Sequence, residues 1–176
     1  MAALEDALAL VRSHEGDAFV PGADESGGAS KYGVTLRYLR ELEDGDIDGD
    51  GDIDADDVRG LTWEEACAKV YIPMWYLHNY GNLPARVSAK VFDLAVNAGP
   101  SRAHKILQRA CRAAGIEDLK DDGILGLETR RAVNCCNADS LVVALRSEAA
   151  GFYRSLVAGR ASRAKWLSGW LNRAYS

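Results

Sequence analysis

The 176-residue sequence contains no apolar run long enough to cross a membrane. Its first residues, MAALEDALALVRSHEG, lack the basic start that is typical of a signal peptide. We therefore expect synthesis in the cytoplasm, with release by another component if the protein acts on the outside. The sequence also lacks CxxC pairs and Cys/His spacings that would indicate a metal site. We expect reduced, mostly buried thiols at Cys67, Cys111, Cys135 and Cys136.

Charge is distributed unevenly along the chain, although the formal net charge is only −5. Residues 44–57 carry −8, whereas residues 101–176 carry +6. A basic C-terminal part suits contact with an anionic polymer such as nucleic acid or bacterial cell wall. Solvated basic helix faces would explain the same charge equally well.

The spacing of apolar residues predicts a mainly α protein without a convincing strand ladder. Residues 17–35 are rich in Gly, Ser and Asp, and we expect an irregular segment or a small hairpin there. Gly16 is expected to end the first helix, Thr35 and Thr62 to begin two others, and Pro73 to follow the end of a helix near Tyr71. Helices are predicted at residues 3–14, 35–43, 62–71, 84–98, 101–114, from 127, at 139–158 and at 161–174.

Residues 44–57, DGDIDGDGDIDADD, match the pattern of an EF-hand calcium loop. Asp46 takes position 1, Gly51 takes position 6 at the sharp turn, and Asp57 takes position 12, where Glu is usual. The shorter Asp57 leaves open whether the ligand shell is complete, and a solvated acidic loop without metal is the alternative. A single loop between helices favours a structural calcium over a sensor. The predicted ligands are Asp46, Asp48, Asp50, Asp52, Asp54 and Asp57.

A glutamate ends the first predicted helix, directly before Gly16. The negative end of the helix dipole and partial burial would both raise the pKa of Glu15, which suits a general acid that protonates a glycosidic oxygen. An exposed glutamate at a helix end is the alternative from this segment alone. Asp24 and Ser30 follow in a glycine-rich turn, where ordinary turn chemistry would also explain them.

The segment that contains these residues resembles the catalytic segment of glycoside hydrolase family 108, the bacterial and phage lysozyme-like muramidases. EGDAF at 15–19 stands where that family has Glu-Gly-Gly-Tyr, and GGAS at 27–30 stands where it has Gly-Gly-Ala-Thr. The acidic run and then LTWEEA, YIPMWY and KVFDLAVNAGPSRAHKILQRA continue the resemblance in order. It covers residues 4 to about 133.

This resemblance implies an N-acetylmuramidase that cleaves the β-1,4 bond between N-acetylmuramic acid and N-acetylglucosamine. Glu15 would be the general acid, and Asp24 and Ser30 would hold the attacking water, which would invert the configuration. The implied glycan contacts are Tyr32, Thr35, Trp75 and Tyr76. The implied fold is a lysozyme-like helical domain at residues 1–98, with the calcium loop at 46–57 as an insertion.

Residues 122–133, DGILGLETRRAV, resemble the Asp-Gly-x-x-Gly-x-x-Thr signature of helical peptidoglycan-binding modules. The signature mostly describes a turn and a helix cap, so it specifies a fold more than binding. We expect residues 99–176 to form a helical, peptidoglycan-binding-like region packed on the first. Trp166 and Trp170 are spaced four apart, which is more typical of core packing than of a sugar platform.

The expected partners are a peptidoglycan glycan strand and a release partner such as a holin, as for a phage endolysin. We expect a monomer with a structural calcium, no organic cofactor, no nucleic acid and no membrane span. Two other functions stay open at this point. One is a non-catalytic cell-wall-binding or secretion-associated protein that retains the fold, and the other is a calcium-dependent interaction module.

Overall fold

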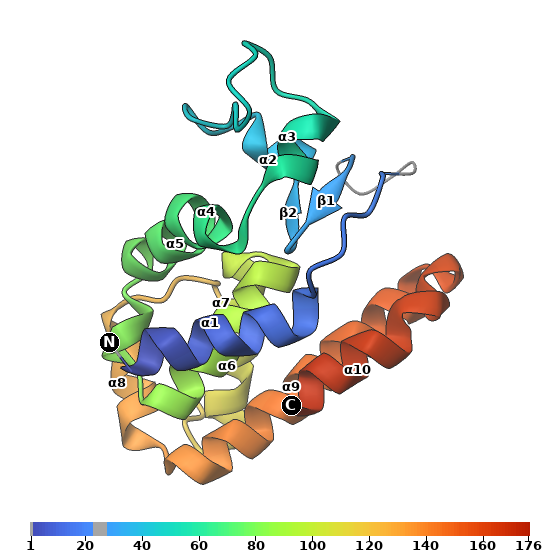
Figure 1. Cartoon of the computed structure of the whole chain (residues 1–176). Coiled ribbons are helices and arrows are strands. Elements are labelled where there is room, and N and C mark those ends of the chain that lie inside the picture. Colours follow the sequence, from blue (N-terminus) through green and yellow to red (C-terminus); the bar gives the residue numbers. More distant parts are fainter. Residues whose placement is uncertain (1, 23–27) are drawn as a thin grey trace. The chain divides into compact units, whose positions relative to one another are not determined.

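The computed structural model describes residues 2–22 and 28–176 of the chain (Figure 1). Contacts divide it into two compact units, one of residues 8–77 and one of residues 1–7 with 78–176. The structure is mainly helical, as predicted. No helix among the described residues is long and apolar enough to cross a membrane.

Helix α1 (Ala2–Glu15) ends at Gly16, as predicted. Gly16 has a φ of 68°, a left-handed conformation that glycine adopts without the steric cost of a Cβ. The chain then forms an antiparallel hairpin of β1 (Ser30–Lys31) and β2 (Val34–Thr35). The predicted small hairpin therefore forms at residues 30–35, the last part of this segment.

Helix α2 (Leu36–Leu39) begins after Thr35, whose hydroxyl accepts a hydrogen bond from the backbone N–H of Tyr38 at 3.3 Å. This start agrees with the prediction, but the helix ends four residues before the predicted residue 43. The chain folds back on the helix end, where a Cβ on Gly45 would overlap the carbonyl oxygen of Leu39. The acidic loop then leads into α3 (Ala55–Gly60).

One continuous helical segment closes the unit of residues 8–77. It consists of α4 (Trp63–Ala66), the π-helical turn η1 (Cys67–Tyr71) and α5 (Ile72–Leu77). The predicted capping box at its start is present, since the Thr62 hydroxyl accepts from the Glu65 N–H at 3.2 Å and the Glu65 carboxylate accepts from the Thr62 N–H at 2.8 Å.

The predicted end of this helix near Tyr71 is wrong, because Pro73 lies inside the helical segment. The N–H of Ile72 donates to the carbonyl of Cys67, five residues back. Proline has no N–H, and its ring clashes with the carbonyl four residues back in a regular α-helix. The wider π turn accommodates the ring, so the segment continues to Leu77.

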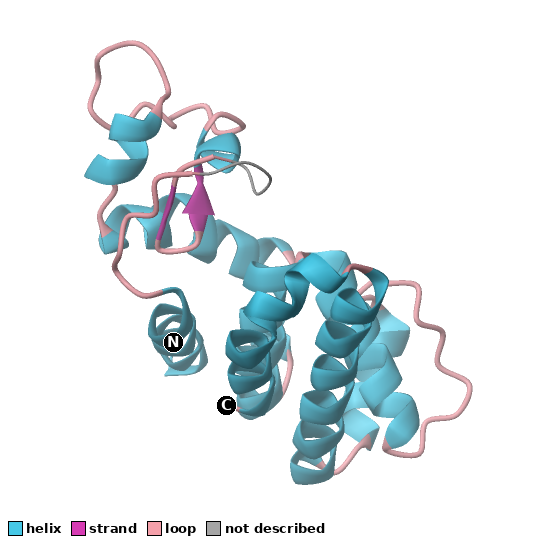
Figure 2. Ribbon diagram, turned by 90° about the vertical axis from the view of Figure 1, so that its right-hand side faces the viewer, coloured by secondary structure: helices cyan, strands magenta, loops and turns pink. Residues whose placement is uncertain are grey.

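The unit of residues 1–7 with 78–176 is a bundle of helices (Figure 2). Helix α9 packs against α7 and α10, and α6 packs against α7. Buried aliphatic residues such as Val91, Leu107 and Leu145 fill the space between them. The elements after residue 78 are η2 (Tyr80–Asn82), α6 (Ala85–Ala98), α7 (Pro100–Ala113), α8 (Leu127–Cys135), α9 (Ala138–Gly159), the 3₁₀ helix η3 (Ala161–Trp166) and α10 (Leu167–Tyr175).

Two predictions about side-chain burial are wrong in part. Trp166 is 53% exposed, whereas Trp170 stacks on Tyr153 with ring centroids 5.4 Å apart. Trp166 is the last residue of η3 and Trp170 lies in α10, so the two rings do not form one buried stripe. Cys67 and Cys111 are buried thiols as predicted, but Cys135 is exposed.

The Asp-Gly-x-x-Gly-x-x-Thr signature forms a loop around a buried glutamine. The Gln108 amide donates to the Asp122 carboxylate at 2.8 Å and to the Thr129 hydroxyl at 3.0 Å, and it accepts from the Gly123 N–H at 2.9 Å. His104 lies beside it, with Nδ1 3.0 Å from the Gly123 carbonyl. The signature residues are used inside the fold, as the sequence indicated.

Candidate functional site

The carboxyl group of Glu15 lies against the turn of the β1–β2 hairpin. A Cβ on Gly33 would lie 2.6 Å from Cδ of Glu15 and 2.7 Å from its Oε2, closer than real atoms approach. The missing side chain at Gly33 therefore provides the space that the carboxyl group occupies. Glu15 itself is half-buried at the end of α1. The hairpin thus positions an acid at a helix end, next to a backbone surface that no other residue type would leave open.

The turn that meets Glu15 has an unusual backbone. Its two central residues, Tyr32 and Gly33, have φ values of 53° and 78°, as in a type I′ hairpin turn. A left-handed conformation costs a residue with a Cβ about 1–2 kcal/mol, so Tyr32 needs support from its surroundings. The Tyr71 hydroxyl supplies part of it by donating a hydrogen bond to the Tyr32 carbonyl.

Aromatic rings pack on this turn from α4 and η1. The rings of Tyr32 and Trp63 meet edge to face, with their centroids 5.7 Å apart. The centroids of the Trp63 and Tyr71 rings are 5.6 Å apart. The Arg12 guanidinium, one turn before Glu15 in α1, lies 5.2 Å from the Trp63 ring centroid. These contacts connect the end of α1 to the hairpin, and they fix the place where Glu15 and Gly33 meet.

Other predicted site residues lie on or near the same hairpin. Ser30 pairs with Thr35 across the two strands, and both are half-buried. The Thr35 hydroxyl is also engaged in capping α2. Asp24 lies outside the described residues. The structure therefore brings Glu15, Tyr32, Ser30 and Thr35 to one hairpin.

The two aromatic residues predicted after Pro73 differ from each other. Tyr76 is 63% exposed, whereas Trp75 is 4% exposed on the same helix α5. The structure does not support a glycan contact for Trp75, because a ring buried to this extent presents almost no face to a sugar. Tyr76 stays a candidate for such a contact.

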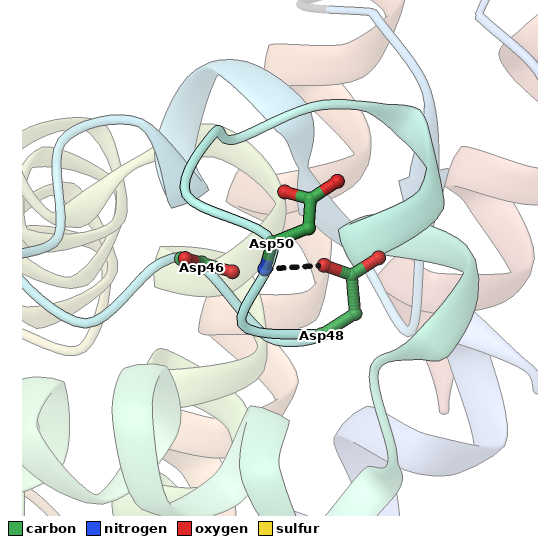
Figure 3. A group of neighbouring side chains, drawn as sticks. All are labelled: Asp46, Asp48 and Asp50. Carbon is green, nitrogen blue, oxygen red and sulfur yellow. Dashed lines mark hydrogen bonds between the residues drawn. The ribbon is translucent and has the colours of Figure 1, made fainter.

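The acidic loop gathers its carboxylates into two groups. Oxygens of Asp46, Asp48 and Asp50 lie within 4.8 Å of one another, and so do those of Asp52, Asp54 and Asp57. Figure 3 shows the first group, in which the Asp50 N–H donates to the Asp48 carboxylate at 3.2 Å. Asp46 accepts from the N–H groups of Gly49 and Gly51, at 2.6 and 3.1 Å. These are positions 1, 3 and 5 of the predicted loop, and they form an acidic cluster that could bind a metal.

Mutual repulsion acts between the carboxylates of the loop. The charge of Asp50 is the main cause that raises the pKa of Asp52, and desolvation with the nearby carboxylates raises the pKa of Asp48. The positive charge of a bound cation would offset this repulsion. A hard cation such as calcium takes six to eight oxygen ligands, and the carboxylates of the loop can supply oxygens of this kind. The residues present therefore fit a divalent cation.

Asp57, at position 12, has a different role from the other loop residues. It is 1% exposed, and its carboxylate accepts from the N–H groups of Ile47 and Asp54 at 2.6 Å each, and from Asp48 at 3.3 Å. Burial acts to raise the pKa of Asp57, but these N–H donors outweigh burial and lower it. The Asp57 carboxylate thus closes the loop by accepting hydrogen bonds from backbone N–H groups at both of its ends.

The loop also connects to the hairpin through the helix that follows it. The Lys31 ammonium of β1 donates to the Arg59 carbonyl at the end of α3, at 2.7 Å. The Arg59 guanidinium lies 4.6 Å from the ring centroid of Phe19, in the segment between α1 and β1. A loop that holds α3 in place therefore also supports the hairpin.

Comparisons with known proteins show the family of the chain. Residues 8–99 match the family model described as glycosyl hydrolase 108. The chain belongs to glycosyl hydrolase family 108. Residues 102–175 match a second family model, described as a predicted peptidoglycan domain. Together these matches identify a glycoside hydrolase that acts on peptidoglycan, and the predicted resemblance is confirmed.

A solved structure is also similar to this family 108 chain. The structure of SagA from Brucella abortus matches it with a TM-score of 0.76 and 27% sequence identity, covering 98% of this chain and 90% of that chain. No curated protein matches the chain.

The sequence did not indicate the residues that hold Glu15 against the hairpin in this family 108 chain. Gly33, Trp63, Tyr71 and Arg12 are not conspicuous in the sequence, because their contacts join distant segments. The one available signal was glycine after an aromatic residue in KYGVT, where a two-residue hairpin turn needs a left-handed backbone.

Proposed function

We propose that this peptidoglycan hydrolase is an N-acetylmuramidase that cleaves the β-1,4 bond between N-acetylmuramic acid and N-acetylglucosamine, with Glu15 as the general acid. The observation that carries the proposal is the Glu15 carboxyl group seated against Gly33. The half-buried carboxyl at the end of α1 is held in one place by the hairpin turn, and a general acid must be positioned in this way to reach the glycosidic oxygen.

In the proposed reaction, Glu15 gives its proton to the glycosidic oxygen as the bond to the anomeric carbon breaks. A water molecule attacks the anomeric carbon from the opposite face and loses a proton, which inverts the configuration. We propose that Asp24 accepts this proton and that Ser30 orients the water, because a hydroxyl can both donate and accept. Tyr32, Thr35 and Tyr76 are proposed as glycan contacts.

Clearing of purified cell walls by Glu15→Gln tests the general acid. The amide keeps the shape of the side chain but has no proton to deliver, so we expect a rate loss of about 10²–10⁴-fold. Glu5→Gln, on the same helix, is the control and should clear walls at the wild-type rate. Clearing by Glu15→Gln at the wild-type rate would refute the role of Glu15.

Analysis of the products tests the bond and the stereochemistry. Muramidase activity leaves N-acetylmuramic acid at the new reducing ends, and NMR during the first turnovers shows the anomer that forms. New ends of N-acetylglucosamine would contradict the proposed bond. A wild-type protein that binds walls without releasing any reducing ends would support the alternative of a non-catalytic wall-binding protein.

We also propose that the loop at residues 46–57 binds a structural calcium ion. The ligands would come from the six predicted aspartates, with Asp46, Asp48 and Asp50 as the group that corresponds to positions 1, 3 and 5. Asp57 would contribute mainly through its carboxylate, which accepts hydrogen bonds from the N–H groups of Ile47 and Asp54 and so closes the loop. The ion would offset the repulsion in the loop and stabilise α3, which supports the hairpin through Lys31.

Thermal unfolding with calcium or with a chelator tests this site. Calcium at 100 times its dissociation constant would stabilise the folded state by about 2.7 kcal/mol, a rise in Tm of roughly 5–10 °C. The rise should shrink in Asp48→Asn and persist in Asp56→Asn, since Asp56 lies outside both carboxylate groups. An identical Tm in calcium and in chelator would contradict the proposal.

The remaining predictions concern organisation. We propose that residues 1–98 form the catalytic region and residues 99–176 a peptidoglycan-binding region. The boundary between the two family matches, at 99 and 102, supports this division. We further propose a monomer made in the cytoplasm and released to the wall by a holin-type partner. Light scattering and co-expression with a holin test these two points.

A further inference from the structure

A hollow of about 320 Å³ lies within the helical unit formed by residues 1–7 with 78–176. The end of α6, the start of α7, and parts of α9, η3 and α10 surround it. Its volume is at the lower end of the range for small-ligand sites, so it suits a ligand about the size of one or two amino acids or of one sugar. The lining residues that matter here are Asn97, Arg102, Phe152, Tyr153, Arg163 and Trp170.

The walls of this hollow come from two segments without acidic residues. Residues 94–116 and 149–176 contain no Asp or Glu, and they supply all of the lining. Arg102 donates to the carbonyl of Ala98 at 3.1 Å, and neither Arg102 nor Arg163 forms an ion pair with any carboxylate that the structure describes. Two guanidinium groups without an anionic partner therefore face one small space, and they favour an anionic ligand.

An aromatic platform forms another wall. The Trp170 ring is stacked on Tyr153, with an angle of 20° between the ring planes. Tyr153 is 1% exposed, and its hydroxyl donates to Oδ1 of Asn97 at 2.8 Å. Tyr153 is thus held from two sides and in turn fixes Trp170, which remains partly exposed. A fixed aromatic face can pack on an aliphatic or sugar surface.

A second hollow lies beside the first. It measures about 440 Å³, and it shares Ala98 and Arg102 with the first. Ser101 and Lys105 also line it. Arg102 therefore lines both spaces, and a ligand longer than one residue would meet it in each. The second space again offers a cation and a hydroxyl but no carboxylate.

We propose that the first hollow binds a carboxylate of the stem peptide of peptidoglycan, with the adjoining aliphatic part of that peptide on Trp170. Arg163 and Arg102 would hold the carboxylate, since the guanidinium fork matches its two oxygens. The proposal rests on the proposed function in that peptidoglycan is the substrate of the same chain. It assigns recognition of the peptide to this hollow and cleavage of the glycan to the hairpin.

Calorimetric binding of soluble wall fragments to the full chain tests this assignment. The probes are a disaccharide-tetrapeptide, the same fragment with its carboxylates amidated, and the peptide-free disaccharide. Wild type should bind the first at least tenfold more tightly than either of the others, because each charge-assisted hydrogen bond is worth about a factor of ten. Equal affinity for all three would overturn the proposal.

Paired variants locate the binding. Arg163→Ala should weaken binding of the disaccharide-tetrapeptide about tenfold or more, whereas Lys165→Ala, on the same 3₁₀ helix but outside the hollow, should leave it unchanged. Trp170→Leu should weaken binding and Trp166→Leu should not. Arg163→Lys keeps the charge without the fork, so its affinity should lie between the two. Thermal melts confirm that each variant is folded.

Two results would overturn the proposal on their own. One is wild-type affinity in folded Arg163→Ala and Arg102→Gln, and the other is a short oligonucleotide that displaces the peptide fragment at equal concentration. Failure of the proposed function is seen separately, as wall clearing that survives in Glu15→Gln. Binding that depends on Arg163 would still stand in that case.

Discussion

Substitution of Gly33 by alanine tests most directly whether the hairpin turn positions the acid. The new Cβ would lie 2.6 Å from Cδ of Glu15 and 2.9 Å from its Cγ. Ordinary carbon contacts lie at about 3.5–4.0 Å, so the Glu15 side chain must move by about 1 Å. A misplacement of this size costs a catalytic group about 10²-fold in rate.

Alanine at residue 33 also changes stability through its backbone. Gly33 has a φ of 78°, where a side chain costs about 1–2 kcal/mol. For a chain of this size the corresponding fall in Tm is roughly 2–8 °C. The variant should therefore remain folded at room temperature, and its loss of wall clearing should exceed what instability explains.

Gly115→Ala is the matched control for this substitution. Gly115 has a left-handed φ of 106°, and no heavy atom lies within 4 Å of the place where its Cβ would be. It should show a similar fall in Tm with wall clearing near the wild-type rate. The reasoning is refuted if folded Gly33→Ala clears walls as fast as Gly115→Ala, because the contact with Glu15 would then have no catalytic consequence.

Three further predictions concern stability. The pKa of His104 is lowered to about 4, chiefly by burial, so the unfolded chain takes up a proton first as the pH falls below 6.5. The contribution of neutral His104 to stability is therefore present above pH 6.5 and lost toward pH 4. Between pH 7 and pH 4.5, the free energy of unfolding measured in urea should fall by about 2 kcal/mol more in wild type than in His104→Gln. Thr62→Ala removes one half of the capping box and should lower Tm by about 2–4 °C in a calorimetric scan. Gln108→Leu leaves the buried Gly123 N–H without its acceptor and should cost about 3 kcal/mol by urea unfolding, whereas a cost below 0.5 kcal/mol would contradict this role.

Much of the local structure could be predicted from single residues. Gly16 ends α1 and Thr62 begins α4, because a left-handed glycine and a hydroxyl acceptor act within one turn of the backbone. The helix end predicted from Pro73 was wrong. The helix continues through this proline with the help of a π-type hydrogen bond from the Ile72 N–H to the Cys67 carbonyl, and residue propensities do not predict such a bond. Local rules succeed where the cause is local.

In the candidate site, too, local features could be predicted from the sequence and contacts between distant segments could not. The helix-end position of Glu15 follows from the sequence, but its contact with Gly33 joins residues 18 positions apart through a turn geometry that only the fold determines. In the acidic loop, the alternate spacing of Asp46, Asp48 and Asp50 places their carboxylates in one cluster. The burial of Asp57 could not be predicted, because it depends on N–H groups that turn inward only once the loop has closed.

The π-helical turn η1 makes the length of this segment as important as its composition. A π turn amounts to one residue inserted into a regular α-helix, and each residue turns the helix by about 100°. Deletion of a single residue such as Ala68 would restore a regular helix and rotate α5 by that angle relative to α4. Buried Trp75 and exposed Tyr76 would then both leave their places, and the Tyr71 hydroxyl would turn away from the hairpin. Natural variation here should therefore consist of substitutions, with the number of residues between Thr62 and Leu77 kept constant.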